Sequence, residues 1–400
     1  MAARFWPWAL AALVAFRVAV PLVALAGVEL PGTPAYDYEP LIGDATGFYA
    51  AARELLSATA GWAGVAAVLL LALGAWAALR LRPVWVAVTA VALAISLAGT
   101  ALVLASRNSG AAVVGWPLLW AIPLAPLRVA GVLDADLAFA TGLALSLAAN
   151  GVAVVATAYV GFRASGRRAI GLAAAALLVL WPLLTRPLAG PSAWENGSWL
   201  VDVGLALYTE PVSTALVATA LAVVLRPRLD GTRLAAAGVL LGFATVVKSS
   251  NGLLAAVVVL FVVRRIGFRR ARPLVLAGAA WLPLVLAYWP KGYPTIDNVP
   301  GFSLEQASRS WGPDTLLFDP VTVAVLLPFA VLGAFALERW TAGLLASVIG
   351  VNALFYTFYE HTHLHPRFLY VSLPALFVLE AAGAGLAIRK GSRSVREAGL

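Results

Sequence analysis

The sequence predicts an all-α polytopic membrane protein with about twelve transmembrane helices. Of its 400 residues, 62% are hydrophobic and only 12% are charged, whereas soluble domains carry about 25% charged residues. The mean hydropathy is +0.90, and a soluble fold could not bury so much apolar surface. The apolar runs are continuous and rich in Ala and Leu, without the alternation typical of a membrane β-barrel. The chain has no Cys, which excludes disulfide and thiol chemistry.

Twelve segments are apolar enough to span a bilayer, which takes about 20 residues, although one of them is short. No linker rich in Pro, Gly or Ser interrupts them, so we expect one transmembrane domain over residues 1–400 and no separate soluble domain. Ala24-Leu25-Ala26 resembles a signal-peptide cleavage site, but the preceding apolar stretch contains Arg17 and is longer than the apolar region of a usual signal peptide. We therefore expect the first helix to stay uncleaved. The segments are 5–27, 61–79, 84–105, 137–160, 169–188, 207–225, 234–248, 251–263, 273–289, 320–337, 341–358 and 368–388.

The distribution of basic residues predicts the orientation of these segments. With both termini in the cytoplasm, 19 of the 28 basic residues lie on the inner side, eight lie outside and Arg17 lies within the first span. Of the 19 acidic residues, 15 fall outside, so the functional polar residues are expected on the outer face. The net charge of +9 is explained by this topology, and it gives no reason to expect nucleic-acid binding.

The predicted external loops are longer than the internal ones. The first, residues 28–60, includes an amphipathic helix in which Phe48, Ala51, Ala52 and Leu55 share one face. The second includes an element at 110–133 with three Pro in about ten residues, bordered by Trp. Because such a stretch disrupts a straight span, we interpret it as interfacial or re-entrant.

Acidic residues gather in the first external loop. Asp37, Glu39 and Asp44 lie within eight residues, and Asp44 opens the amphipathic helix. Asp44 can act as a helix N-cap, which accepts backbone N–H groups. It can equally act as a general base that takes a proton from an acceptor hydroxyl. The two roles are compatible, and Asp37 or Glu39 could bind the acceptor or sugar, or be the base instead.

All three histidines, His361, His363 and His365, lie within five residues before the last span. Three neutral imidazoles with Glu360 could bind a divalent metal such as zinc. Alternatively, His365 and Arg367 could donate hydrogen bonds to a phosphate, and the segment could also be a structural loop. We expect no metal or other cofactor, with the histidine site as the alternative.

A lone Lys between two spans is a third candidate. Lys248, followed by Ser249 and Ser250 and then by a helix start, suits a phosphate, but it could also be a snorkelling Lys in a tight turn. Glu210 opens another span from the outer side and could bind sugar or acceptor. It could also simply favour the positive end of its helix.

Taken together, these segments resemble the GT-C superfamily of membrane glycosyltransferases. The first loop is similar in placing the acid Asp44 ahead of an aromatic-rich amphipathic helix, and Lys248 falls where relatives carry a basic residue between two helices. The late segment resembles a motif in which a basic residue and a Tyr precede a Pro and an apolar span. That segment reads Arg367-Phe368-Leu369-Tyr370-Val371-Ser372-Leu373-Pro374.

The resemblance implies a bacterial mannosyltransferase-like enzyme of the plasma membrane. It would move mannose or a similar sugar from a polyprenyl-phosphate donor to an envelope glycan, glycolipid or protein on the outer face, with inversion at the anomeric carbon. Asp44 would be the base, and Lys248, Arg367 and His365 would hold the donor phosphate. Asp37, Glu39 and Glu210 would bind sugar or acceptor.

Two other functions fit the sequence less well. A secondary transporter of about twelve spans usually shows inverted repeats and midplane charges, but no repeat is evident and the midplane charges are few, namely Arg17 and Glu380. A non-catalytic protein of an envelope-assembly complex would also explain the external loops of mixed charge.

Overall fold

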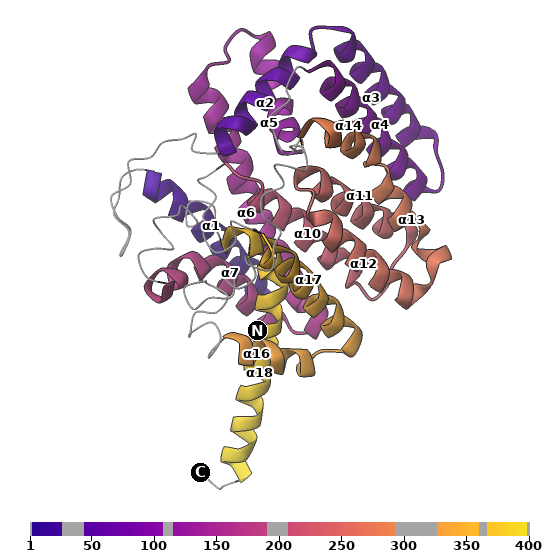
Figure 1. Ribbon diagram of the computed structural model, residues 1–400. Coiled ribbons are helices and arrows are strands. Elements are labelled where there is room, and N and C mark those ends of the chain that lie inside the picture. Colours follow the sequence, from indigo (N-terminus) through magenta and orange to yellow (C-terminus); the bar gives the residue numbers. More distant parts are fainter. Residues whose placement is uncertain are drawn as a thin grey trace. The chain divides into compact units, whose positions relative to one another are not determined.

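The computed structural model describes residues 2–25, 44–106, 115–189, 207–292, 326–359 and 366–397. Within these ranges the chain forms helices and no strands (Figure 1), which confirms the predicted all-α class. The apolar runs fold as helices because a backbone surrounded by lipid must satisfy its polar groups within its own segment.

Seven of the helices in the described part are long and apolar enough to cross a membrane, so the protein is a multi-pass membrane protein. The predicted number of twelve is not confirmed, because four further apolar helices have only 10–17 residues. The seven candidate spans are Phe5–Val23, Trp62–Arg80, Val84–Ala105, Ala135–Ser165, Phe268–Ala287, Arg339–Thr357 and Leu369–Lys390, and the shorter helices are Arg168–Trp181, Glu210–Val224, Gly231–Val247 and Leu327–Ala336.

The chain divides into two compact units, each assembled from segments that are distant in sequence. Unit 1 comprises residues 1–37, 150–203 and 301–400, and unit 2 comprises residues 38–149 and 204–300. The long helix α6 (Ala135–Ser165) contributes its first half to unit 2 and its second half to unit 1.

Unit 2 is a set of helical hairpins. Helices α3 and α4 run side by side (Figure 1), and α11 packs closely on α13. Gly238 of α11 permits that approach, because a Cβ there would lie 2.2 Å from the carbonyl oxygen of Leu274. The helices are α2 (Asp44–Ala58), α3 (Trp62–Arg80), α4 (Val84–Ala105), α5 (Gly115–Val129), α10 (Glu210–Val224), α11 (Gly231–Val247), α12 (Asn251–Ile266), α13 (Phe268–Ala279) and α14 (Leu282–Gly292).

Basic residues of unit 2 lie at helical turns at one end of its helices. Arg80 and Arg82 lie at the turn between α3 and α4, and Arg226 and Arg228 lie at the turn between α10 and α11. These turns lie at the same end, because the first residue of α11 packs against Trp85 in the first turn of α4. The other ends of α10 and α11 therefore face away from this basic end.

The predicted amphipathic segment of the first external loop and the Pro-rich element at 110–133 both contain helices in unit 2. On α2, the four residues predicted to share a face, Phe48, Ala51, Ala52 and Leu55, are all buried, as expected. The Pro-rich element forms the 15-residue helix α5 with Pro123 and Pro126 inside it. Pro therefore does not prevent helix formation here, and α5 is shorter than a span.

Unit 1 packs its last helix against several others. Helix α18 contacts α16, α7 and α17, and a Cβ on Gly333 of α16 would lie 1.8 Å from the carbonyl oxygen of Leu379. Pro374 occupies the first turn of α18, where Pro is tolerated, and the residues before this helix form the 3-10 helix η3. The elements are α1 (Ala2–Leu25), α7 (Arg168–Ala189), α16 (Leu327–Ala336), α17 (Arg339–Thr357), η3 (Pro366–Ser372) and α18 (Leu373–Glu397).

Candidate functional site

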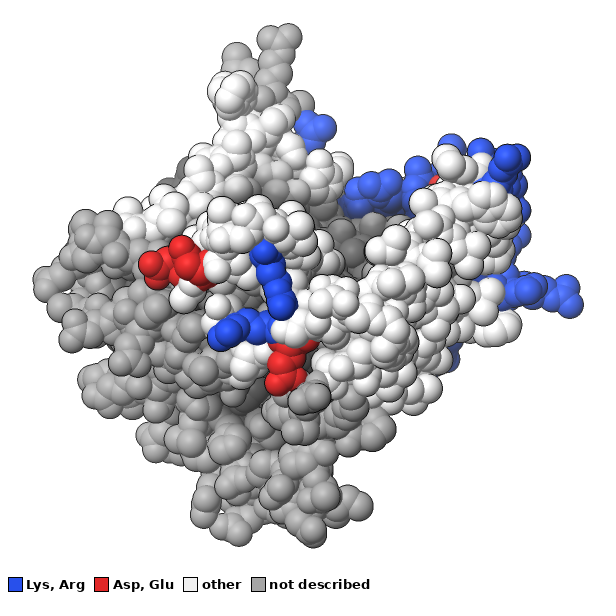
Figure 2. Space-filling model, turned by 90° about the horizontal axis from the view of Figure 1, so that it is seen from above, with Lys and Arg blue, Asp and Glu red and all other residues white. Residues whose placement is uncertain are grey.

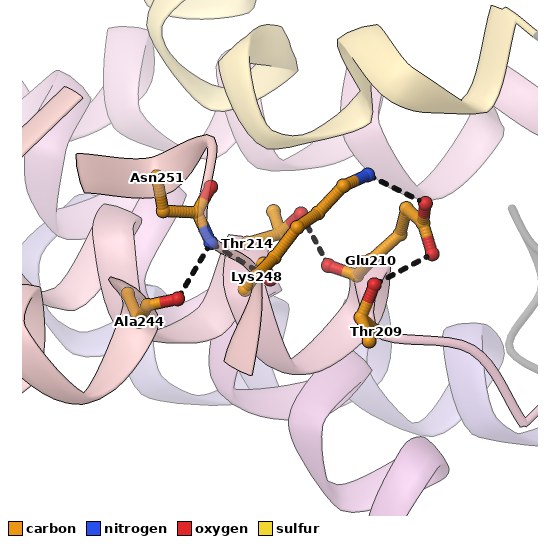
Figure 3. A network of polar contacts seen from close by, with 7 residues as sticks. Thr209, Glu210, Thr214, Ala244, Lys248 and Asn251 are labelled. Atoms are coloured by element: carbon orange, nitrogen blue, oxygen red, sulfur yellow. Dashed lines mark hydrogen bonds and ion pairs between the residues drawn. The ribbon is translucent and has the colours of Figure 1, made fainter. Parts of the chain in front are cut away.

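Two of the predicted site residues form an ion pair in unit 2. Lys248 Nζ lies 2.8 Å from Glu210 Oε1, and the Glu210 side chain is only 3% exposed, while that of Lys248 is 13% exposed (Figure 3). The sequence predicted a phosphate ligand in Lys248 and a sugar or acceptor ligand in Glu210, but it gave no sign that the two side chains meet. In this pair, the buried Glu210 carboxylate orients the Lys248 ammonium group, which has limited access to solvent.

Helix ends hold both partners in place. Lys248 follows the last residue of α11 in an extended conformation, and the next helix begins three residues later at Asn251. The Asn251 side chain donates hydrogen bonds to the carbonyl oxygen of Ala244 at 2.9 Å and to Ser213 Oγ at 3.0 Å. Asn251 thereby ties the Lys248 turn to α10, and Figure 3 shows its bond to Ala244.

Glu210 lies in the first turn of α10, where a negative charge is favoured by the helix dipole. Thr209 Oγ1 donates to Glu210 Oε2 at 3.3 Å, and Thr214 Oγ1 donates to the Glu210 carbonyl oxygen at 2.8 Å. Glu210 thus uses one carboxylate oxygen for Lys248 and the other for Thr209. This geometry is compatible with both roles expected of Glu210: an acid that favours the positive end of its helix, and a ligand for sugar or acceptor.

The ion pair lies at the end of unit 2 opposite to the basic turns. Glu210 begins α10, which ends at Val224, two residues before Arg226. Lys248 directly follows α11, whose first turn contains Arg233. Helix α12 then returns toward Arg264 and Arg265 in its last turn. The chain direction therefore separates the Glu210–Lys248 pair from these four arginines by the length of these helices.

Two indoles of α5 connect the amphipathic helix α2 with the helix that carries Glu210. Trp116 Nε1 donates to the carbonyl oxygen of Leu207 at 2.7 Å, three residues before Glu210. The ring of Trp120 lies 5.8 Å from that of Trp116 and 5.6 Å from Tyr49 of α2. Both tryptophans are fully buried. Within unit 2, α2 and α5 therefore lie at the same end as the ion pair.

Asp44, the predicted base, is the first residue of α2. Its side chain lies outside the described part of the structure, so the backbone alone places it at the start of this helix. Arg367 lies in η3, and its side chain also falls outside that part. The predicted ligands Asp37, Glu39, His361, His363 and His365 lie outside the described residues altogether. No group of three metal-ligating side chains occurs among the residues that are described.

Unit 1 contains a buried polar cluster at a different predicted motif. The Nη2 atom of Arg17 donates to Tyr370 Oη and to Asn150 Oδ1, the latter at 3.2 Å, and Tyr370 Oη donates to the same Asn150 oxygen at 3.2 Å. Arg17 and Tyr370 are 353 residues apart in sequence. A buried intramembrane Arg held in this way is a candidate functional residue in its own right.

Sequence reasoning identified Arg17 as a charge within a span and Tyr370 as part of the late motif, but it did not connect them. Only the polar character of Arg17 inside an apolar helix signalled that it needed partners. Asn150 gave no such signal, because a single Asn in a long apolar helix has no characteristic spacing.

No family model matches the chain, and neither a curated protein nor a solved structure shows significant similarity to it.

Proposed function

We propose that the protein is a membrane glycosyltransferase of the GT-C type that transfers a sugar from a polyprenyl-phosphate donor to an acceptor at the outer face of a bacterial plasma membrane. The observation that carries the proposal is the assembly of α2, α5 and the Glu210–Lys248 pair at one end of unit 2 through Trp116 and Trp120. This arrangement supports a site at the membrane surface, where a lipid-linked donor and a polar acceptor can meet.

The orientation of unit 2 supports the outer face. The basic turns gather at one end of its helices, and basic loops are retained in the cytoplasm. The Glu210–Lys248 pair and the start of α2 would then lie on the external side, with both termini of the chain inside. An acceptor such as an envelope glycan, glycolipid or protein would reach the site from there.

The proposed reaction is a single displacement. The Asp44 carboxylate accepts the proton of an acceptor hydroxyl, and the hydroxyl oxygen attacks the anomeric carbon of the donor. The bond between that carbon and the phosphate oxygen breaks, and the polyprenyl phosphate leaves with the electron pair. Attack opposite to the leaving group inverts the anomeric centre. Mannose or a similar hexose is the proposed sugar.

Cations stabilise the leaving phosphate in this proposal. Lys248 has three donor hydrogens, and the contact with Glu210 Oε1 uses one of them. A phosphate at its accessible side would receive a charge-assisted hydrogen bond. Arg367 and His365 are the further proposed donors. Glu210 positions Lys248 in this scheme and, with Asp37 and Glu39, contributes to binding sugar or acceptor.

The test is sugar transfer from a polyprenyl-phosphate hexose by the purified protein in vesicles. We expect Lys248→Ala and Arg367→Ala each to lower turnover by about tenfold or more, since a hydrogen bond to a charged group contributes about 1.5–3 kcal/mol. Arg82→Ala, at the basic end of α3, is the matched control and should keep normal turnover. Normal turnover in both test variants would exclude these residues from the donor phosphate site.

One observation favours a transporter as the second candidate. Glu380, in the α18 span, is 3% exposed, and neither of its carboxylate oxygens has a hydrogen-bond partner among the described residues. Intramembrane acids often mark ion pathways. Uptake of a solute into vesicles that is lost in Glu380→Gln, in a protein without transfer activity, would favour transport.

A further inference from the structure

An apolar groove opens on unit 2 beside α2 and α5. It encloses about 640 Å³ and is lined by α2, α3, α5 and Leu102 of α4, a size within the range of about 300–1,000 Å³ found for ligand pockets. Its walls include Leu55, Val68 and Ala125, and Thr59 is the one polar side chain among the described residues that line it. Such a lining suits a hydrocarbon chain and offers nothing to a sugar.

The groove is lined by only the first half of the candidate span α3. Its wall on α3 runs from Gly64 to Leu71, which is about 10 Å along a helix. Helix α3 begins at Trp62, a residue typical of the membrane interface, and ends at Arg80. The groove therefore occupies the half of the span that lies next to the interface, where a lipid of that leaflet places its acyl chains.

The groove is continuous with the lipid-facing surface. Val65, Val68 and Leu69 of α3 line it and are 63–67% exposed, and Ile122 of α5 is 60% exposed. An exposed apolar patch of this kind marks an interaction surface, and in a membrane span that surface is covered by lipid. In the view of Figure 2, most of the described surface is neither basic nor acidic; basic and acidic side chains lie near its middle, and further basic side chains project at the right-hand margin.

A basic side chain lies at the rim of the groove. Leu118, Ala121 and Ala125 form the α5 wall, and Arg128 continues this stripe one turn later. Arg128 Nη1 donates to Ser57 Oγ at 3.2 Å, and Ser57 adjoins the groove residue Leu56. The guanidinium is exposed, so its remaining N–H groups can form paired hydrogen bonds with a phosphate.

We infer that this groove binds a phospholipid of the surrounding leaflet, with an acyl chain between α3 and α5 and the phosphate at Arg128. The site is separate from the donor phosphate site proposed at Lys248, and it does not depend on the transfer reaction. A lipid held here would fill the space between α2, α5 and the α3–α4 hairpin.

The test uses the full-length protein in vesicles with a phosphatidylglycerol probe that carries a diazirine in one acyl chain. After photolysis, labelled peptides should come from α3 and α5. Unlabelled phosphatidylglycerol should compete, whereas diacylglycerol with the same chains and soluble glycerol phosphate should not. If diacylglycerol competed as well as phosphatidylglycerol, the phosphate would have no role in binding. If glycerol phosphate competed and diacylglycerol did not, the site would bind a free anion and not a lipid.

Two variants test binding of the acyl chain and binding of the lipid phosphate separately. Ala125→Phe fills the groove and should remove the labelling of α5, while Ala75→Phe, on the exposed surface of α3, should leave it unchanged. Arg128→Gln should weaken competition by phosphatidylglycerol by about tenfold, while Arg82→Gln should not.

Labelling spread evenly over the apolar helices, or unchanged in Ala125→Phe, would overturn the proposal. Normal labelling in a protein inactive in sugar transfer would leave this site established and only the transfer function refuted.

Discussion

Lys248 Nζ lies 2.8 Å from Glu210 Oε1, joining the end of α11 to the start of α10. The two residues are 38 positions apart, and each lies at the helix end remote from the arginine turns. Because the carboxylate is almost fully buried, each charge depends on the other for compensation. This relationship gives the candidate site a cation with a fixed position.

We expect the ion pair to stabilise the fold cooperatively. Glu210→Gln and Lys248→Met should each lower the thermal midpoint in detergent, because each leaves the partner charge buried without its counterion. The double variant should lose less than the sum of the two, corresponding to a coupling of about 0.5–3 kcal/mol. Arg233→Met and Asp230→Asn, an exposed pair at 3.3 Å, form the control cycle. Additive losses at Glu210 and Lys248 would show that the pair makes no coupled contribution.

The indole of Trp116 should be important for the geometry of the ion pair. Trp116→Phe keeps an aromatic ring but leaves the buried Leu207 carbonyl without its donor, at a cost of about 1–3 kcal/mol. Because Leu207 precedes Glu210 by three residues, we expect both lower stability and weaker donor use. Trp120→Phe loses the equivalent bond to Ala138 and should affect stability alone. If both variants lowered donor use equally, the loss would be a general effect of destabilisation.

The topology can be checked directly. We expect reporters fused after Arg228 and after Arg265 to report a cytoplasmic location, and reporters in loops 28–60, 290–319 and 359–367 to report an external one. The physical reason is the retention of basic loops in the cytoplasm. A cysteine-accessibility assay on the naturally Cys-free chain provides an independent readout. An external location for 264–272 would reverse the orientation and place the proposed site on the wrong side.

Asp44→Asn should separate the capping role from the catalytic role. Asn caps a helix nearly as well as Asp, so the thermal midpoint should change little, while loss of a general base should lower turnover by about 10²–10⁴-fold. Asp37→Asn and Glu39→Gln are the comparison variants. Loss of turnover in either of them, with Asp44→Asn active, would move the base to that residue. Full activity in all three would contradict the proposed role of the first loop.

The sequence by itself determined the class of the protein and much of its local structure. Continuous apolar runs can satisfy their backbone only as helices, and the i, i+3, i+4, i+7 pattern from Phe48 to Leu55 correctly predicted the buried face of α2. The charge distribution likewise predicted that Lys248 and Glu210 lie away from the basic turns. The helical periodicity is local, so the residues within one segment specify it, and the charge distribution is a sum over the loops that requires no knowledge of how the helices pack.

The tertiary structure decided which distant residues meet. The sequence predicted separate roles for Glu210 and Lys248 and did not indicate that they pair. It noted Arg17 without finding Tyr370 and Asn150, which lie 353 and 133 residues away. It interpreted 110–133 as an interfacial or re-entrant element, but it did not indicate that two indoles of α5 would join α2 to the residues just before α10. Such contacts depend on how helices pack, and in a chain of uniformly apolar helices many packings satisfy the same hydrophobic pattern. Close approaches at residues such as Gly238 and a few buried hydrogen bonds select one of them, and neither leaves a periodic signal in the sequence.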